Sequence, residues 1–130
     1  MKADSFQRFV LDQLELGGLR GVVCRAMFGG HGLYRRDAFF GILHKGRLYF
    51  KTDESTRAGY LKRGMTPFRP NARQTIRTYY EVPIDIVEDS EQLIAWAEGA
   101  IKAGRRAARR RPAARGGRRR PGPERAPGLM

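Results

Sequence analysis

The chain is poor in the residues on which disulfide-bonded, secreted and membrane proteins depend. It has one cysteine among 130 residues, so it cannot form an internal disulfide, and such a chain suits a reducing compartment. No segment approaches the roughly 18 to 20 apolar residues of a membrane helix, and the N-terminus lacks the apolar core of a signal peptide. These absences predict a cytoplasmic protein with no membrane partner. We interpret Cys24, which lies in an apolar run, as a small buried side chain and not as a reactive thiol.

Residues that commonly carry catalysis are scarce as well. The two histidines, His31 and His44, match no zinc-binding spacing with Cys24. Two of the three serines lie at predicted helix starts, where helix capping explains them. The acidic pairs at 53–54 and 88–89 also precede predicted helices, where negative charge complements the helix dipole. The sequence therefore predicts no catalytic, cofactor-binding or metal-binding residue, and a protein that is not an enzyme.

Positive charge is concentrated at the C-terminal end. The formal net charge is +13, but residues 105–130 hold ten arginines and one acid, whereas residues 1–104 hold 16 basic and 12 acidic side chains. Segment 105–130 is otherwise almost entirely alanine, proline and glycine, so it cannot bury enough surface to offset its ordering entropy. We expect a folded domain over 1–104 and a disordered tail over 105–130. As an alternative for its first part, residues 105–111 prolong the last helix until Pro112 stops it.

The basic tail has two interpretations. Arginines on a flexible segment neutralise phosphates and release counterions, which predicts non-specific, salt-sensitive contact with DNA or RNA. No aromatic residue is interleaved among them, so base stacking on the tail is not predicted. The alternative is an inert, solvated extension, because the chain uses 21 arginines against five lysines, as a GC-rich coding bias alone produces. The candidate nucleic-acid residues are Arg105, Arg106, Arg109, Arg110, Arg111, Arg115, Arg118, Arg119 and Arg120.

The first half of the domain predicts a helix followed by a meander of strands. Apolar residues at helical spacing over 4–16 predict an amphipathic helix with Asp4 as its N-cap. An apolar run over 22–28 predicts a strand that is buried on at least one face. The segments 31–35, 38–44 and 47–52 are separated by two-residue turns, as in antiparallel hairpins.

The turn at Lys45–Gly46 fixes a register between two of these strands. It pairs Gly41 with Phe50, so that the aromatic ring lies across the bare backbone of the glycine. One face of the sheet then carries Phe39, Leu43, Leu48 and Phe50, and the opposite face carries Phe40, Ile42, Tyr49, His44 and Lys51. Because the second face is only half polar, we expect a helix or a second subunit to cover part of it.

The second half of the domain predicts two helices and one strand. Residues 53–65 predict a short helix that is capped by Ser55 or Thr56 and closed by Gly64. Segment 66–74 contains two prolines and predicts a loop, and 75–83 predicts a strand near a sheet edge. A broad apolar stripe over 88–103, with Asp89 as N-cap, predicts the last helix.

Three closely spaced glycines, Gly29, Gly30 and Gly32, have the composition of a phosphate-binding loop. Such a loop leads from a strand into a helix, so that free N–H groups and the helix dipole meet the anion. These glycines instead join one predicted strand to another, and they match neither G-x-G-x-x-G nor the P-loop. We interpret them as a tight turn or bulge that requires positive φ, with ligand binding as the less favoured alternative.

Several separated motifs resemble the N-terminal domain of the TfoX/Sxy family, over residues from about 5 to 102. The matching positions are Arg25, Ala26, Met27, Phe28, Gly29, Gly30, Gly32, Leu33, Tyr34, Leu48, Tyr49, Phe50, Lys51, Thr52, Asp53, Gly64, Met65, Pro67, Phe68, Tyr79, Tyr80, Val82 and Pro83. The resemblance implies an α+β domain with an antiparallel sheet and flanking helices. This agrees with the predicted elements, which give about four to five strands.

The resemblance also implies a function in the regulation of bacterial competence, in which family members act with a cyclic-AMP-dependent transcription activator. The family's second, C-terminal domain is replaced here by the arginine-rich tail. We therefore expect a regulator or adaptor that binds a protein partner of the transcription machinery, as a monomer or a homodimer. Two alternatives are a plain interaction domain with an inert tail and an enzyme or small-ligand module. The last would use an anion site formed by Arg25, His31, Tyr34 and Lys51.

Overall fold

The structure is a computed structural model that describes residues 3–27 and 29–110. Its helices are α1 (Ala3–Leu16), α2 (Glu54–Lys62), α3 (Ile84–Val87) and α4 (Ser90–Arg110). Its strands are β1 (Val22–Met27), β2 (Gly30–Arg35), β3 (Ala38–His44), β4 (Arg47–Lys51), β5 (Pro67–Asn71) and β6 (Gln74–Glu81). The predicted α+β class is confirmed, with six strands in place of four or five.

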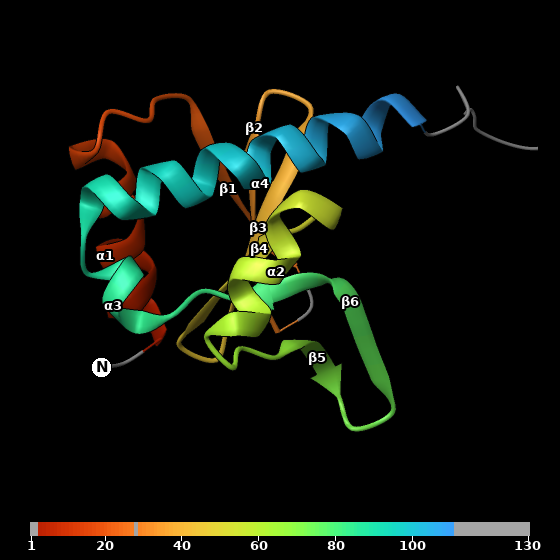
Figure 1. The fold of residues 1–130 in the computed structure, drawn as a ribbon. Coiled ribbons are helices and arrows are strands. Elements are labelled where there is room, and N and C mark those ends of the chain that lie inside the picture. The colour runs from red at the N-terminus through yellow and green to blue at the C-terminus, as the bar shows by residue number, and fades with distance from the viewer. Residues whose placement is uncertain (1–2, 28, 111–130) are drawn as a thin grey trace, which may run out of the picture.

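The six strands form an antiparallel sheet in the order β1-β2-β3-β4-β6-β5. Short turns join β1, β2, β3 and β4 one after another along the chain. Helix α2 then lies between β4 and the β5–β6 hairpin. Figure 1 shows α4 crossing the strands and extending past them, while the β5–β6 hairpin projects away from the helices. The strand predicted over 75–83 is therefore not at an edge, because β6 lies between β4 and β5.

The register predicted for the Lys45–Gly46 hairpin is confirmed. Gly41 pairs with Phe50 and Leu43 with Leu48. A Cβ atom on Gly41 would lie 3.4 Å from the Phe50 ring, so the ring does lie against the bare backbone of the glycine. The two-residue turn and the aromatic–glycine pair both favour this register over its alternatives.

A β-bulge corrects the predicted face of two aromatic residues. Leu33 of β2 pairs with Gly41, whereas the next residue, Tyr34, pairs with Phe39, so Phe40 is the extra residue. The bulge reverses the alternation of side chains at this point. Phe40 therefore packs in the main core, 5.9 Å from the Phe50 ring, and Phe39 lies on the opposite face.

The main core lies between the sheet and the helices. Helix α4 contributes a continuous apolar stripe to this core, which includes Leu93, Ala97 and Ile101. The Asp89 carboxylate accepts the N–H of Gln92 at 3.2 Å and confirms the predicted N-terminal cap of this helix. Helix α1 already includes Asp4, so the N-cap predicted at Asp4 is wrong.

Strands, and no described helix, cover the second face of the sheet. A smaller cluster buries Ile42, Tyr49, Phe68 and Tyr79. The Phe68 ring of β5 lies 4.8 Å from Tyr49 and 5.2 Å from His44, so the sheet curls over this face. The expectation that a helix covers this face is thus wrong among the described residues. Cover by a second subunit stays a prediction.

Segment 66–74 contains strand β5, although two prolines predicted a loop. Both prolines lie in β5, at Pro67 and Pro70, and β5 is the outermost strand on its side of the sheet. An outermost strand tolerates proline because one row of its N–H groups has no ladder partner. At the opposite edge, no residue of β1 is fully buried, so only Val22 and Cys24 partly meet the expectation of a buried face.

The glycine cluster turns the chain between β1 and β2, and its members serve different purposes. Gly29 has φ +67° and is the predicted positive-φ residue. The prediction of positive φ fails for Gly30 and Gly32, which lie in β2. Gly30 is required by close approach, because a Cβ atom there would collide with the carbonyl oxygen of Leu43. The glycines connect two strands, so they do not form a phosphate-binding loop that leads into a helix.

The bulge predicts unequal costs for two neighbouring substitutions. Phe40→Ala should lower the free energy of unfolding by about 3 to 5 kcal/mol, because it empties a fully buried site. Phe39→Ala should cost clearly less, because its ring is half-buried on the second face. Urea denaturation followed by circular dichroism measures both values. A larger cost at Phe39 would contradict the observed bulge.

Two glycine substitutions separate backbone collision from backbone conformation. Gly30→Ala should destabilise the domain by about 1 to 3 kcal/mol or more, because the methyl group displaces the neighbouring strand. Gly46→Ala has open space around the added methyl group but φ +72°, so it should cost only about 1 to 2 kcal/mol. Thermal and urea denaturation of both variants test this order.

Candidate nucleic-acid interface

Helix α4 continues beyond Gly104 and orders the first part of the arginine-rich segment. The alternative that residues 105–111 prolong the last helix is thus confirmed as far as Arg110, and residues 111–130 lie outside the described part of the chain. Arginine and alanine both favour helix, and basic side chains complement the negative end of the helix dipole. The positions Lys102, Arg105, Arg106 and Arg109 follow helical spacing, so we call these four residues the basic end of α4.

Close packing of α4 on β3 fixes the position of this basic end. A Cβ atom on Gly104 would lie 2.7 Å from the carbonyl oxygen of Phe39, so the helix approaches the strand at a distance that only glycine allows. Ala103 is buried beside it. The turns of α4 that follow extend beyond the sheet, as Figure 1 shows.

On one side of the basic end, a shallow depression of about 370 Å³ joins α4 to β2. Arg35 of β2 lines it with Lys102, Arg105 and Glu98. The Arg35 Nε atom donates to the carbonyl oxygen of Arg20 at 2.9 Å, which orients the guanidinium group. Three cations against one carboxylate make this depression suitable for an anionic group such as a phosphate.

On the other side, a second depression of about 380 Å³ separates α4 from the start of α2. Its cations are Lys51 of β4, Arg57 of α2 and Arg106 of α4. The Arg57 Nε atom is buried and has no hydrogen-bond partner among the described residues. Asp53 and Glu54 also line this depression, so its positive charge is smaller than that of a pure arginine cluster.

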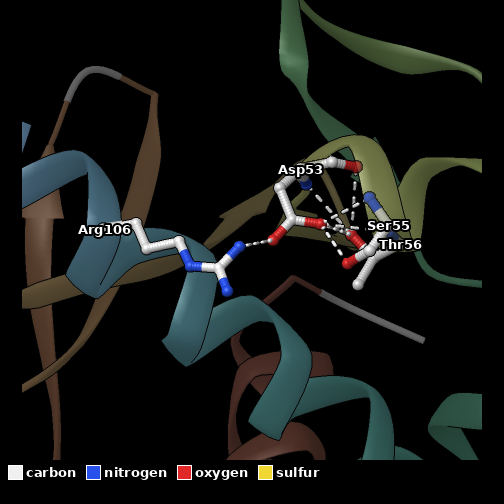
Figure 2. Close-up of polar contacts among 4 residues, drawn as sticks. All are labelled: Asp53, Ser55, Thr56 and Arg106. Carbon is white, nitrogen blue, oxygen red and sulfur yellow. Dashed lines mark hydrogen bonds and ion pairs between the residues drawn. The ribbon is translucent and has the colours of Figure 1, made fainter.

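Asp53 organises the second depression and caps α2 (Figure 2). One carboxylate oxygen accepts the Ser55 hydroxyl at 2.6 Å and the N–H groups of Ser55 and Thr56 at 2.9 and 3.1 Å. The Thr56 hydroxyl accepts the Asp53 N–H at 3.0 Å, which completes a capping box. The N-cap is therefore Asp53, and the prediction of Ser55 or Thr56 is wrong, because the Asp53 carboxylate accepts the free N–H groups of both residues.

The other Asp53 oxygen faces Arg106, whose Nη1 atom lies 3.5 Å away. The hydrogen bond from Ser55 is the main cause that lowers the pKa of Asp53, with smaller contributions from the backbone N–H groups and from Arg106, while burial opposes them. The carboxylate is therefore ionised at neutral pH. This long ion pair connects the capping motif to the first arginines of the segment.

The residues proposed for a small-ligand anion site do not converge. Arg25 lies over the Tyr34 ring at 5.2 Å, and Lys51 lies over the Tyr79 ring at 5.1 Å. Phe39 links the two rings, at 4.8 Å from Tyr34 and 5.3 Å from Tyr79. His31 instead lines a separate depression. Among the described residues, these four side chains thus do not come together at one place.

The candidate metal ligands do not form a site either. The described residues contain no group of three metal-ligating side chains. Cys24 is half-buried and accepts a hydrogen bond from Gln7 at 3.5 Å, and burial raises the pKa of its thiol. Burial also disfavours the charged form of His44, and for a histidine this lowers the pKa. Both groups are thus uncharged at neutral pH and consistent with packing positions.

The sequence predicted the arginines of the basic end, but Lys102, its fourth member, and two neighbouring arginines were missed. Lys102 could have been found, because it precedes Arg105 and Arg106 by three and four residues on a predicted helix. Arg35 and Arg57 carry no such signal. They come from a hairpin and from another helix, and only the tertiary packing places them beside α4.

The capping motif predicts a pH-dependent contribution to stability. At neutral pH, Asp53→Ala should lower the free energy of unfolding by about 1 kcal/mol. The folded pKa of Asp53 lies below its ordinary value of 3.8, so this stabilisation is complete above that value and is lost as the pH falls through the lowered pKa. Asp53→Asn keeps a capping oxygen and is the control. Urea denaturation between neutral and acidic pH should show a shrinking difference for the alanine variant, and a constant difference would contradict the assignment.

Comparison with known proteins agrees with the fold and the motifs. The TfoX N-terminal domain model matches residues 14–104, close to the range expected from the sequence. No match to the family's C-terminal domain occurs, and a comparison with curated proteins gave no match. Among the described residues, no helix has the length and apolar character to cross a membrane. Because the match covers most of the chain and includes the strands, α2 and most of α4, the protein belongs to the TfoX N-terminal domain family, which is associated with competence-related proteins.

Proposed function

We propose that this protein is a non-enzymatic, cytoplasmic bacterial regulator that binds the phosphate backbone of nucleic acids and acts with a protein partner. One observation supports the nucleic-acid part. Helix α4 holds Lys102, Arg105, Arg106 and Arg109 on a rigid scaffold, and Arg35, Lys51 and Arg57 from three other elements line the depressions beside them. The family's association with competence-related proteins supports a role in regulating competence.

The proposed contact is electrostatic and independent of base sequence. Each phosphate that a lysine or arginine neutralises releases condensed counterions, and this makes the affinity fall steeply with salt. The exposed aromatic surface around Tyr34 offers little to unpaired bases, because Arg25 and Phe39 both already lie against the Tyr34 ring. We therefore expect duplex DNA to bind at least as well as a single strand of the same length.

Removing charge from the basic end should weaken DNA binding and reduce its salt dependence. The test variant is Arg105→Gln, Arg106→Gln and Arg109→Gln together, measured by fluorescence anisotropy with a duplex of about 20 base pairs over about 50 to 200 mM salt. The slope of log K against log salt should become less negative by up to about 3, and the affinity for DNA at low salt should decrease more than about tenfold.

The matched control removes three arginines from the β5–β6 hairpin. Arg69, Arg73 and Arg77 are exposed, and that hairpin projects away from the helices (Figure 1). Changing these three to Gln alters net charge equally and should change affinity by less than about twofold if binding is local to α4. An equal loss in both variants would show that only net charge matters.

A chain ending at Arg110 separates the helical arginines from residues 111–130. The tail hypothesis predicts a further loss of affinity on truncation, and the inert-extension alternative predicts none. If the truncated chain and the triple α4 variant both bind like the full chain, the proposed nucleic-acid function is wrong. Capture from native bacterial lysate, with and without nuclease treatment, then tests the protein partner separately.

A further inference from the structure

The two edges of the sheet are built differently. Edge strand β5 carries Pro67 and Pro70, which lack N–H groups and discourage the addition of another strand. Edge strand β1 spans six residues and contains no proline. Beyond its ladder with β2, the backbone of β1 makes no backbone hydrogen bond to another described residue. The β1 edge is thus open to pairing where the β5 edge is not.

The side chains of β1 on the second face of the sheet follow an apolar–cationic–apolar pattern. Val23 and Met27 are 46% and 41% exposed, and they are two of the few large apolar side chains exposed on the described surface. Arg25 lies between them and is exposed. Its guanidinium group lies over the Tyr34 ring at 5.2 Å, and Tyr34 stacks on Phe39 at 4.8 Å. The cation is therefore held in place before any partner binds.

We propose that β1 binds an extended segment of a partner protein as a seventh strand, and that this segment carries an acidic residue between two apolar residues at alternate positions. Backbone pairing supplies affinity in this mode of recognition, and alternate side chains supply specificity. An acidic side chain opposite Arg25 and apolar side chains opposite Val23 and Met27 complement the exposed pattern. This inference rests on the proposed function, because it gives the chemistry of its protein partner.

A second copy of this chain fits the same edge less well. A two-fold pairing of β1 strands places Arg25 opposite itself, or opposite Val23 or Met27 in the neighbouring registers, because opposed residues must share a face of the sheet. None of these registers gives Arg25 an anionic partner. A formal charge of +13 on each copy adds repulsion between the two molecules.

The test uses two fluorescein-labelled peptides, TVTETVT and TVTKTVT, which read the same in both directions and so suit parallel or antiparallel addition. Fluorescence anisotropy with the full chain should show at least tenfold tighter binding of the Glu peptide. In the Arg25→Glu variant the preference should reverse toward the Lys peptide. Circular dichroism verifies the fold of this variant, and Arg25→Gln, which should remove the preference in either direction, replaces it if it unfolds.

The triple α4 variant, with Arg105, Arg106 and Arg109 changed to Gln, is the second control. It should retain binding of the Glu peptide, although it loses DNA binding if the proposed function is correct. The triple α4 variant tests DNA binding, and the Arg25 variants test peptide binding. Failure of one proposal can therefore be distinguished from failure of the other. If the Glu peptide binds the full chain but not this variant, the arginines of α4 and not β1 hold it, and the inference is wrong.

Amide hydrogen exchange locates the bound peptide. The Glu peptide should slow exchange in β1 by at least tenfold and leave β5 unchanged. Equal binding of the two peptides, no measurable binding of either, or protection confined to segments other than β1 would overturn the proposal. Slow exchange in β1 that depends on protein concentration without peptide would assign the edge to a second copy and overturn it as well.

Discussion

The bulge in β3 determines which aromatic residues reach each side of the sheet. By adding one residue opposite β2, it turns Phe40 toward the helices and Phe39 toward the other face. Phe40 then packs against Phe50 beneath α4, and Phe39 connects Tyr34 with Tyr79. A regular strand would exchange these two rings, so that Phe39 would face the helices and Phe40 would lie between Tyr34 and Tyr79.

The core that Phe40 completes also determines where positive charge is held. Helix α4 packs its apolar stripe on that core and approaches β3 so closely at Gly104 that a side chain there would collide with the strand. The same helix continues to Arg110, so its arginines are ordered by packing that takes place one and two turns earlier. Helix propagation adds a hydrogen bond for each further residue, which makes this extension inexpensive once the helix is anchored.

Local signals in the sequence were sufficient for α1, α2, α4 and one hairpin, whereas the short helix α3 was not predicted. The α4 stripe, the Asp89 cap and the Lys45–Gly46 register all depend on residues within a few positions of one another, and the structure confirms them. The bulge was not predictable, because it depends on how β2 and β3 are offset by packing. Strand β5 was missed for a related reason: its prolines forbid a central strand, and only its place at the edge makes them acceptable.

The candidate sites show the same division between local and tertiary information. The arginines after Gly104 are visible in composition, and their helical spacing follows from the helix that precedes them. The additions of Arg35 and Arg57 depend on the tertiary fold. The cap of α2 lies between these two cases. All candidate residues are close together in the sequence, but only the structure shows that the Asp53 carboxylate accepts two N–H groups and is the cap in place of Ser55.

The basic end of α4 and the open edge of β1 are neighbours through β2. Arg35 lines the depression beside α4, and in the sheet it pairs with Val22 of β1. A polyanion that contacts Arg35 and a partner strand paired with β1 would therefore lie beside neighbouring strands of the sheet. Repulsion between two such ligands is screened over about 8 to 10 Å at ordinary ionic strength, so if both proposals hold, the two ligands would bind with an unfavourable coupling that is strongest at low salt.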